Sequence, residues 1–447
     1  MQYFQLYKQK SISADQAVQN IQSGQWIDYG FAASKPHLLD EALAKRKDDL
    51  KDIKIRGGLA LSPVAVVACD PHQETFTYAS WHFSGIERKY HDEGRCFYIP
   101  MLYRNLPSYY ERNLTVDVAM LMVSEMDANG YFSFSISNSA SRAIVDAAKM
   151  VILEINPTLP QALSGHGGHI HISEVDWLVE GEPTPLPTLK SAAPTDNDLT
   201  IANMILNEIH DGATIQLGIG TMPNTVGALI AKSDLKNLGM HTEMLVDAYL
   251  DMYESGRLNN TKKPLNPGVG VWTFSLGSER LYNWIHQNPA LSSFPVSYTN
   301  DPHMMRHLDG LTTINNCVEI DLYGQVCSES AGTRHISGTG GQLDFVTGGY
   351  MAKKGKSFVC FSATYLSKSG ELKSRVVPSL TTGGIVTDPR TQVHYLVTEF
   401  GMVNLAGLST WERAEAIISI AHPMFRESLI QSANAMKIWR NTHRTSL

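Results

Sequence analysis

Residues 216–247 read QLGIGTMPNTVGALIAKSDLKNLGMHTEMLVD. Apolar residues precede the glycines of the turn at 218–223, and the segment after the turn has the apolar spacing of a helix. This pattern predicts a strand, a tight turn and a helix, and free backbone N–H groups at such a helix start can face an anion. The turn is therefore a candidate cradle for a phosphate or an oxyanion. Glu243, expected at the end of the next strand, would place a carboxylate beside it as a candidate nucleophile.

An earlier part of the chain repeats this pattern. Residues 23–30, SGQWIDYG, align position for position with residues 211–218, DGATIQLG. Similarity over such a long period indicates a duplicated strand-helix-strand unit. The offset between the copies drifts from 188 residues (211 − 23) to 185 farther along the chain, and at that offset Gly58 falls opposite Glu243 (243 − 58 = 185), so the first copy has the scaffold without the acid.

Apolar strands alternate with helical patterns in both halves, as at residues 116–122. Continuously apolar strands are typical of a parallel sheet covered by helices on both faces. The sequence therefore predicts an α/β fold with two similar open α/β domains. The proline-rich passage at 181–194 is the predicted linker. It divides the chain into an N-terminal domain at 1–190 and a C-terminal domain at 191–447 that carries Glu243.

Composition excludes several classes of protein. The 447 residues include 37 Lys and Arg against 44 Asp and Glu, and these scattered charges form no basic stripe for nucleic acid. No segment approaches the ~18 apolar residues of a membrane span, and the N-terminus lacks an apolar signal core. The five cysteines include no CxxC pair, which predicts buried thiols in a reducing compartment. We expect a soluble, cytoplasmic protein with no nucleic-acid or membrane partner.

Two simpler readings of these motifs compete with a ligand site. A glycine-rich turn alone is more often a helix entry than a binding site, and Pro223 at its third glycine position disfavours a dinucleotide fingerprint. His166, His169 and His171 are dense, yet no cysteine or further ligand set completes a metal site around them. We expect core or interface histidines and no metal.

Six motifs together resemble the acetyl-CoA hydrolase/transferase family of class I CoA-transferases over nearly the whole chain. The resemblance is closest to the 4-hydroxybutyrate CoA-transferase and butyryl-CoA:acetate CoA-transferase branch. It implies two similarly folded domains with the active site in the cleft between them, and it assigns the role of nucleophile to Glu243. The motifs are HTEM at 241–244, QLGIG at 216–220, EIDLYGQV at 319–326, SGTGGQLDF at 337–345, VTEFG at 397–401 and IAHPMFR at 420–426.

The resemblance also implies further site residues. Asn315 matches a family asparagine near the reacting centre, although a role in a turn or cap explains it equally well. Lys354, with its neighbouring lysines, is a candidate partner for the CoA phosphates, and a solvated charge run remains the alternative. The candidate oxyanion and substrate contacts are Gln216, Gly218 and Gly220, and the candidate CoA-binding glycines are Gly338, Gly340 and Gly341.

The chemistry of such a transfer explains why a glutamate is needed. A glutamate that attacks an acyl-CoA forms a mixed anhydride, and the released CoA thiolate then gives a glutamyl-CoA thioester and a free acid. A second acid reverses these steps in a ping-pong cycle, and backbone donors stabilise the charge on the thioester oxygen. We expect a transferase that links acetyl-CoA to 4-hydroxybutyrate or butyrate in acetate metabolism, with CoA as its cofactor and a homodimer as its assembly.

Two alternatives remain open. An acyl-CoA hydrolase would use the same residues with water as the acceptor, and no residue separates it from a transferase. A non-catalytic CoA-responsive binding protein is disfavoured, because Glu243 and both glycine-rich segments are intact.

Overall fold

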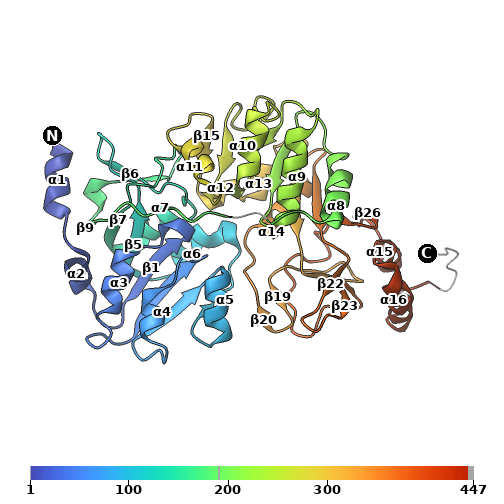
Figure 1. The fold of residues 1–447 in the computed structure, drawn as a ribbon, viewed down its shortest axis with the longest axis horizontal. Coiled ribbons are helices and arrows are strands. Elements are labelled where there is room, and N and C mark those ends of the chain that lie inside the picture. The colour runs from blue at the N-terminus through green and yellow to red at the C-terminus, as the bar shows by residue number, and fades with distance from the viewer. Residues whose placement is uncertain (1, 190–191, 441–447) are drawn as a thin grey trace. The chain divides into compact units, whose positions relative to one another are not determined.

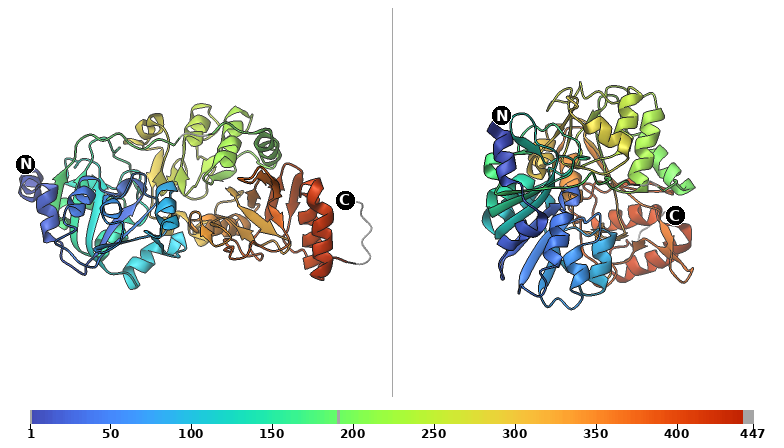
Figure 2. Two further views of the ribbon diagram at one scale, coloured as in Figure 1. Left: turned by 60° about the horizontal axis from the view of Figure 1, so that its bottom comes forward. Right: turned by 60° about the vertical axis from the view of Figure 1, so that its left-hand side comes forward.

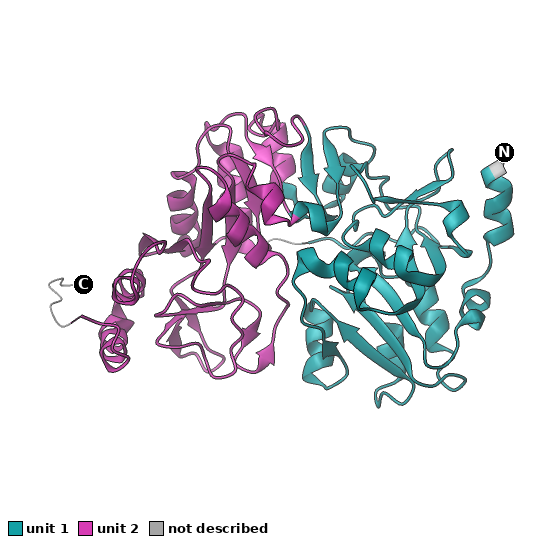
Figure 3. Ribbon diagram, turned by 180° about the vertical axis from the view of Figure 1, so that it is seen from behind, with its two compact units in different colours: residues 1–190, 243–247, 269–299 teal, residues 191–242, 248–268, 300–447 magenta. Residues whose placement is uncertain are grey.

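The computed structural model describes residues 2–189 and 192–440. The chain forms two compact units (Figure 3). Unit 1 contains residues 1–190, 243–247 and 269–299, and unit 2 contains the remainder. Between residues 189 and 192 the grouping changes from unit 1 to unit 2, and Glu243 is grouped with unit 1. The reason is local pairing, since the strand after Glu243 pairs with a strand from residues 269–299.

Unit 1 is organised around a parallel sheet of seven strands in the order β4-β3-β2-β1-β5-β7-β9 (Figure 1). The strands are β1 Trp26–Phe31, β2 Ile53–Gly58, β3 Phe76–Ser80, β4 Phe97–Tyr98, β5 Val116–Val123, β7 Ala148–Ile155 and β9 Trp177–Glu180. The shorter strands are β6 Tyr131–Ser133, β8 His169–His171, β12 Met244–Leu245, β13 Gly270–Trp272, β14 Phe274–Ser275 and β15 Leu291–Ser293. The helices are α1 Gln2–Lys10, α2 Ala14–Ala17, α3 Leu38–Ala44, α4 Ala65–Cys69, α5 Gly85–Asp92, α6 Leu106–Arg112, α7 Ser141–Ala147, α11 Glu279–Ile285 and α12 Val296–Thr299.

Successive residues of β1 face opposite sides of this sheet. Ile27 joins the apolar core that includes Leu39 of α3. Asp28, its neighbour, lies on the other face, where it accepts hydrogen bonds from Arg56 Nε at 2.8 Å and from the Tyr110 hydroxyl of α6 at 2.7 Å. Helices therefore cover both faces, and a buried ion pair joins β1 to β2.

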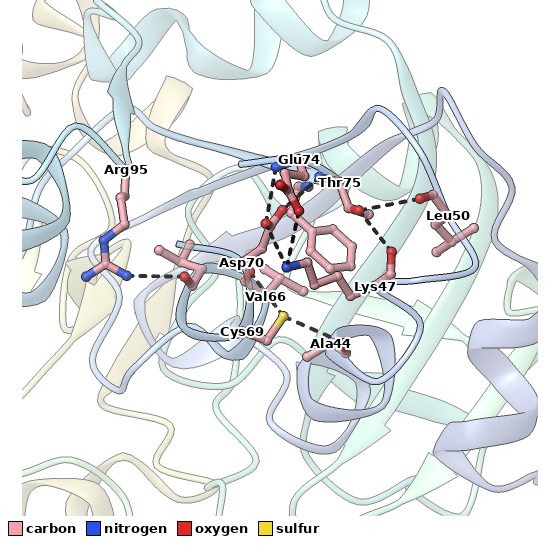
Figure 4. Close-up of polar contacts among 11 residues, drawn as sticks. Ala44, Lys47, Leu50, Val66, Cys69, Asp70, Glu74, Thr75 and Arg95 are labelled. Atoms are coloured by element: carbon pink, nitrogen blue, oxygen red, sulfur yellow. Dashed lines mark hydrogen bonds and ion pairs between the residues drawn. The ribbon is translucent and has the colours of Figure 1, made fainter. Parts of the chain in front are cut away.

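Asp70 organises the turn between α4 and β3 (Figure 4). Its carboxylate accepts backbone hydrogen bonds from Glu74, Thr75 and Phe76 at 3.1, 2.8 and 2.9 Å, and it forms an ion pair with Lys47 at 3.3 Å. Burial acts to raise the pKa of Asp70, but these contacts outweigh burial and lower it. The Asp70 carboxylate thus accepts hydrogen bonds from three backbone N–H groups of the turn that would otherwise need water as their acceptor.

Unit 2 contains a six-stranded sheet in the order β11-β10-β16-β21-β25-β26, parallel except for β26. The terminal helices α15 and α16 lie side by side (Figure 2). The sheet strands are β10 Thr214–Leu217, β11 Gly239–Met240, β16 Thr312–Asn316, β21 Lys356–Cys360, β25 Tyr395–Thr398 and β26 Gly401–Asn404. The other strands are β17 Glu319–Asp321, β18 Val326–Cys327, β19 Ser330–Ala331, β20 Arg334–His335, β22 Thr364–Leu366, β23 Leu372–Ser374 and β24 Val376–Val377. The helices are α8 Asp196–Leu206, α9 Thr221–Lys232, α10 Asp247–Glu254, α13 Pro302–Met305, α14 Gln342–Met351, α15 Thr410–Ser419 and α16 Pro423–Ala435.

The two sheets share one topology. In unit 1 the strands β2-β1-β5-β7-β9 are neighbours, and in unit 2 the strands β11-β10-β16-β21-β25 stand in the same order of succession. β1 begins at Trp26 and β10 at Thr214, which the sequence repeat aligns. The α/β fold predicted from the sequence is confirmed, and the shared strand order supports the duplication. No helix within residues 2–189 or 192–440 has the length and apolar character of a membrane span.

Candidate functional site

The 218–221 turn lies at the point where the strand order of unit 2 reverses. It follows β10, and the neighbouring strand β16 ends at Asn315 and Asn316. In open α/β sheets, ligands bind outside the carboxyl ends of the strands at such a point. The topology therefore selects the same turn that the sequence selects.

Gln216 and Asn315, both predicted to be site residues, form a reciprocal amide pair. Gln216 Nε2 donates to Asn315 Oδ1 and Asn315 Nδ2 donates to Gln216 Oε1, each at 3.2 Å. Gln216 Oε1 also accepts the Ile314 N–H at 3.2 Å, and both amide side chains are buried. These contacts hold the ends of β10 and β16 together and give both side chains a supporting role.

Glycine is required at residue 218 because two oxygen atoms of β16 lie very close to its backbone. A Cβ there would lie 2.7 Å from Asn315 Oδ1 and 3.0 Å from the Ile314 carbonyl oxygen. Its own N–H donates to that carbonyl at 2.8 Å, so the Gly218 N–H is not available to an oxyanion. The sequence suggested donors near residues 218–221, and the structure removes the first of them.

The backbone N–H groups of Ile219, Gly220 and Thr221 are the remaining donors of the turn. None of the three has an acceptor in the described part of the chain. Gly220 precedes α9 with φ of 130°, a conformation that favours glycine, and α9 runs for 12 residues. The turn therefore presents three N–H groups at the positive end of a helix, where a negatively charged oxygen is favoured.

The second glycine-rich segment, the 337–341 loop, enters α14. Gly338, Gly340 and Gly341 are buried, and Gly340 has φ of 54°. Thr339 Oγ1 donates to Glu329 Oε2 at 3.1 Å. The loop is therefore tied to a buried acid rather than extended as a flexible connection.

Hydrogen bonds connect the two glycine-rich segments within unit 2. Asn316 Nδ2 donates to the Ile219 carbonyl at 3.2 Å, and Ser328 Oγ donates to the Asn316 carbonyl at 3.2 Å. Gln342 Nε2 then donates to Ser328 Oγ at 2.8 Å. The sequence pattern did not single out these three linking residues, although Asn316 is adjacent to Asn315 and Gln342 belongs to the SGTGGQLDF motif.

Glu243 lies in a bend between β11 and β12, not at a strand end. β11 ends three residues earlier, and β12 pairs with β14 of unit 1. The Glu243 carbonyl accepts the N–H groups of Thr273 and Phe274 at 3.1 and 3.2 Å, which fixes its backbone. The residue is partly exposed.

An aromatic cluster lies beside the Glu243 segment in unit 1. Phe31 stacks on Trp81 with 4.6 Å between centroids and meets Phe274 edge-on at 4.9 Å. The Tyr103 ring is 5.2 Å from Trp81. Burial raises the pKa of Tyr103, and the charge of Glu243 raises it further, which places the carboxylate near these rings. Sequence pattern alone could not assemble residues from four separate segments.

Gly58, the sequence counterpart of Glu243, packs into the same cluster. A Cβ at this position would lie 2.9 Å from Trp81 and 3.1 Å from Phe31. The first copy of the repeat therefore has no room for an acid where the second copy carries one.

Lys354 lies at the amino ends of the parallel strands of the unit 2 sheet, whereas the 218–221 turn follows the carboxyl end of β10. It lines a cavity of about 330 Å³ with Gly212 and Gly310, residues that precede β10 and β16. β21 starts at Lys356, which forms an ion pair with Glu208 at 2.6 Å. Five strand residues span ~17 Å, so the structure does not bring Lys354 to the glycine-rich segments.

Two of the three clustered histidines have ordinary polar partners. His169 Nδ1 is 3.0 Å from Ser164 Oγ, and His171 Nδ1 is 2.7 Å from Ser173 Oγ. Across residues 2–189 and 192–440, no group of three or more His, Cys, Asp or Glu side chains is arranged to hold a metal ion.

The chain is similar to known proteins over nearly its whole length. The acetyl-CoA hydrolase/transferase N-terminal domain model matches residues 1–190, and the C-terminal domain model matches residues 277–433. The chain is 45% identical to the butyryl-CoA:acetate CoA-transferase of Anaerostipes caccae, over 99% of this chain and 100% of that protein. It is 38% identical to the 4-hydroxybutyrate coenzyme A transferase of Clostridium kluyveri, over 96% and 98%. The crystal structure of RipA from Yersinia pestis matches with a TM-score of 0.90 and 34% identity, over 98% and 100%.

Proposed function

Because this chain belongs to the acetyl-CoA hydrolase/transferase family and is a CoA-transferase, we propose that it exchanges coenzyme A between acetyl-CoA and butyrate or 4-hydroxybutyrate. The observation that carries this proposal is the 45% identity, over the full length, to a butyryl-CoA:acetate CoA-transferase. The aromatic cluster of Phe31, Trp81, Tyr103 and Phe274 agrees with it, because an apolar wall beside the carboxylate suits a short alkyl chain.

Glu243 is the proposed nucleophile. Its carboxylate attacks the thioester carbonyl of acyl-CoA, the C–S bond breaks, and CoA leaves as the thiolate. The thiolate attacks the glutamyl carbonyl of the mixed anhydride, which releases the first acid and forms a glutamyl-CoA thioester. The incoming carboxylate then attacks that thioester and expels CoA thiolate again. The thiolate takes the new acyl group, and Glu243 is regenerated as a carboxylate.

The N–H groups of the 218–221 turn are the proposed donors to the developing oxyanion. Each such donor is worth ~3 kcal/mol of transition-state stabilisation. Two features support this assignment: the three N–H groups lack acceptors among the described residues, and β11, the strand beside β10, ends three residues before Glu243 in the chain. The 337–341 loop is the proposed contact for CoA. Contact between Lys354 and the CoA phosphates also stays a proposal, but the position of Lys354 before β21 does not support it.

Trapping tests the nucleophile directly. The protein is incubated with acetyl-CoA, reduced with borohydride and digested, and the peptide that carries Glu243 is mapped by mass spectrometry. We expect conversion of the Glu243 carboxyl to an alcohol only after acyl-CoA treatment, and no conversion in Glu243→Gln. Turnover by a protein whose Glu243 peptide stays unmodified under trapping conditions would contradict the mechanism.

The acceptor decides between transfer and hydrolysis. We expect loss of the acetyl-CoA thioester to depend on added butyrate or 4-hydroxybutyrate and to be slow in buffer without a carboxylate. Equal rates with and without acceptor would identify a hydrolase instead. The same preparation, measured by light scattering, tests the proposed homodimer, and activity that survives a chelator agrees with a reaction that needs no metal.

A further inference from the structure

Three buried carboxyl groups surround the start of α14 in unit 2. They belong to Glu329, in the connection between β18 and β19, to Asp344 of α14, and to Asp388, which precedes β25. Glu329 and Asp344 both raise the pKa of Asp388, so each of them lies within electrostatic reach of Asp388. None of the three takes part in the proposed acyl transfer.

Asp388 holds the first residue of α14. Its Oδ2 accepts a hydrogen bond from Gln342 Nε2 at 2.7 Å. Its Oδ1 is buried and has no hydrogen-bond partner in the described part of the chain. An ionised carboxylate with one bare oxygen in a buried site is costly, whereas the protonated group is neutral and still accepts from Gln342.

Glu329 is hydrogen-bonded to the 337–341 loop, which precedes α14. Its carboxylate accepts hydrogen bonds from Thr339 Oγ1 at 3.1 Å and from Thr387 Oγ1 at 3.0 Å. Thr339 belongs to the 337–341 loop, and Thr387 is the neighbour of Asp388. The loop is therefore fixed at its middle by one acid and at its exit by the other.

This arrangement reaches the other glycine-rich segment. The amide of Gln342 bonds both Asp388 and Ser328, and Ser328 leads through Asn316 to the carbonyl of Ile219. A shift of Gln342 would thus disturb the 337–341 loop and the 218–221 turn together.

We propose that Glu329, Gln342 and Asp388 form a clamp that positions the 337–341 loop, and that the clamp is closed when the Asp388 carboxyl carries a proton. Asp388 and Gln342 are positioning residues, since they act through the loop. The consequence for activity rests on the proposed function, whereas the consequence for loop order does not.

Burial raises the pKa of Asp388 to about 7, and the charges of Glu329 and Asp344 raise it against the opposing hydrogen bond from Gln342. The thiol of Cys317, after β16, also faces Asp388, and burial raises the pKa of that thiol, so it adds no charge near neutrality. Above pH 7 the Asp388 carboxyl becomes negatively charged within this buried cluster. Repulsion from Glu329 and Asp344 then favours opening of the clamp.

Hydrogen exchange of the full chain tests the clamp without reference to catalysis. Peptides that cover residues 334–345 are followed by mass spectrometry between pH 5.5 and 8.5, with labelling times scaled to the intrinsic exchange rate at each pH. We expect protection of these peptides to fall by up to about tenfold per pH unit above pH 7, while peptides from β5 stay unchanged. Protection that is the same at pH 6 and pH 8 would overturn the proposal.

Two substitutions at one position provide the matched control. Asp388→Asn mimics the protonated acid and keeps an acceptor for Gln342, so the loop should stay protected at every pH. Asp388→Ala removes the acceptor, so the loop should exchange quickly at every pH. If Asp388→Ala does not fold, Gln342→Ala removes the donor and should give the same result. A pH profile in Asp388→Asn that matches the wild type would assign the titration to another group, and the clamp would be refuted.

Steady-state kinetics of CoA transfer are measured on the same variants. In the wild type we expect KM for acetyl-CoA to rise as pH increases through 7, with a smaller change in kcat, and we expect this rise to be absent in Asp388→Asn. A pH-independent wild-type KM would overturn the proposed link between the clamp and CoA binding. Absence of acyl transfer at every pH would refute the proposed function and leave the exchange result intact.

Discussion

Substitution of Gly218 by alanine is the sharpest test of the 218–221 turn. The new Cβ would lie 2.7 Å from Asn315 Oδ1 and 3.0 Å from the Ile314 carbonyl oxygen, whereas carbon and oxygen normally meet at ~3.3 Å or more. Neither oxygen can move freely, because Gln216 holds the Asn315 amide and the Gly218 N–H holds the carbonyl. The turn itself must therefore move.

The cost follows from that displacement. Overpacking at a closely packed site destabilises a protein by about 1–3 kcal/mol. Loss of alignment of one oxyanion donor lowers kcat by about 100-fold, which corresponds to ~3 kcal/mol. We expect Gly218→Ala to lower the unfolding midpoint modestly and kcat strongly, measured by thermal unfolding and by transfer of CoA from acetyl-CoA to butyrate.

Gly85→Ala is the matched control. Gly85 begins α5, and an added Cβ there meets no atom within 4 Å. Alanine should raise stability slightly, by about 0.5–1 kcal/mol, and leave kcat unchanged. If Gly218→Ala keeps wild-type kcat, the turn does not position an oxyanion donor, whatever happens to stability.

Three further experiments test the buried charges. Arg56→Met should lower the free energy of unfolding in urea by about 3–5 kcal/mol, because it leaves the buried Asp28 carboxylate without its ion-pair partner. The double variant with Asp28→Asn should recover much of that loss, and an equally unstable double variant would show that the ion pair is not the cause. Asp388 has a pKa of about 7 in the folded protein against 3.8 for an ordinary aspartate, so its contribution to stability is complete below pH 4. That contribution is lost as pH rises toward 7, by up to about 1.4 kcal/mol per pH unit, and Asp388→Asn should flatten this pH dependence of stability in urea titrations. Burial lowers the pKa of Lys263 from 10.5 to about 7, so stability should rise between pH 7 and 10 as the folded amine loses its proton, and Lys263→Met should remove that rise; an unchanged slope would contradict the assignment.

Local sequence pattern determined the framework of this protein. The alternation of apolar strands and helices predicts the parallel sheets, and the repeat between residues 23–30 and 211–218 predicts two copies of one unit, in agreement with the shared strand order. The glycine-rich turn before α9 and the contrast between Glu243 and Gly58 are also readable from sequence. Each of these signals depends on residues close together in the chain or on a repeated short pattern.

Only the tertiary structure decided which groups meet. It gave the Gly218 N–H to a carbonyl 96 residues away in sequence (residue 314), and it placed Lys354, expected to pair with the CoA phosphates, at the amino ends of the strands, away from the glycine-rich segments. It also brought Asp388 to Gln342, a contact that spans 46 residues and that no spacing rule predicts. Hydrogen bonds and repulsion between buried charges depend on distance in space, and chain folding sets that distance independently of separation along the sequence.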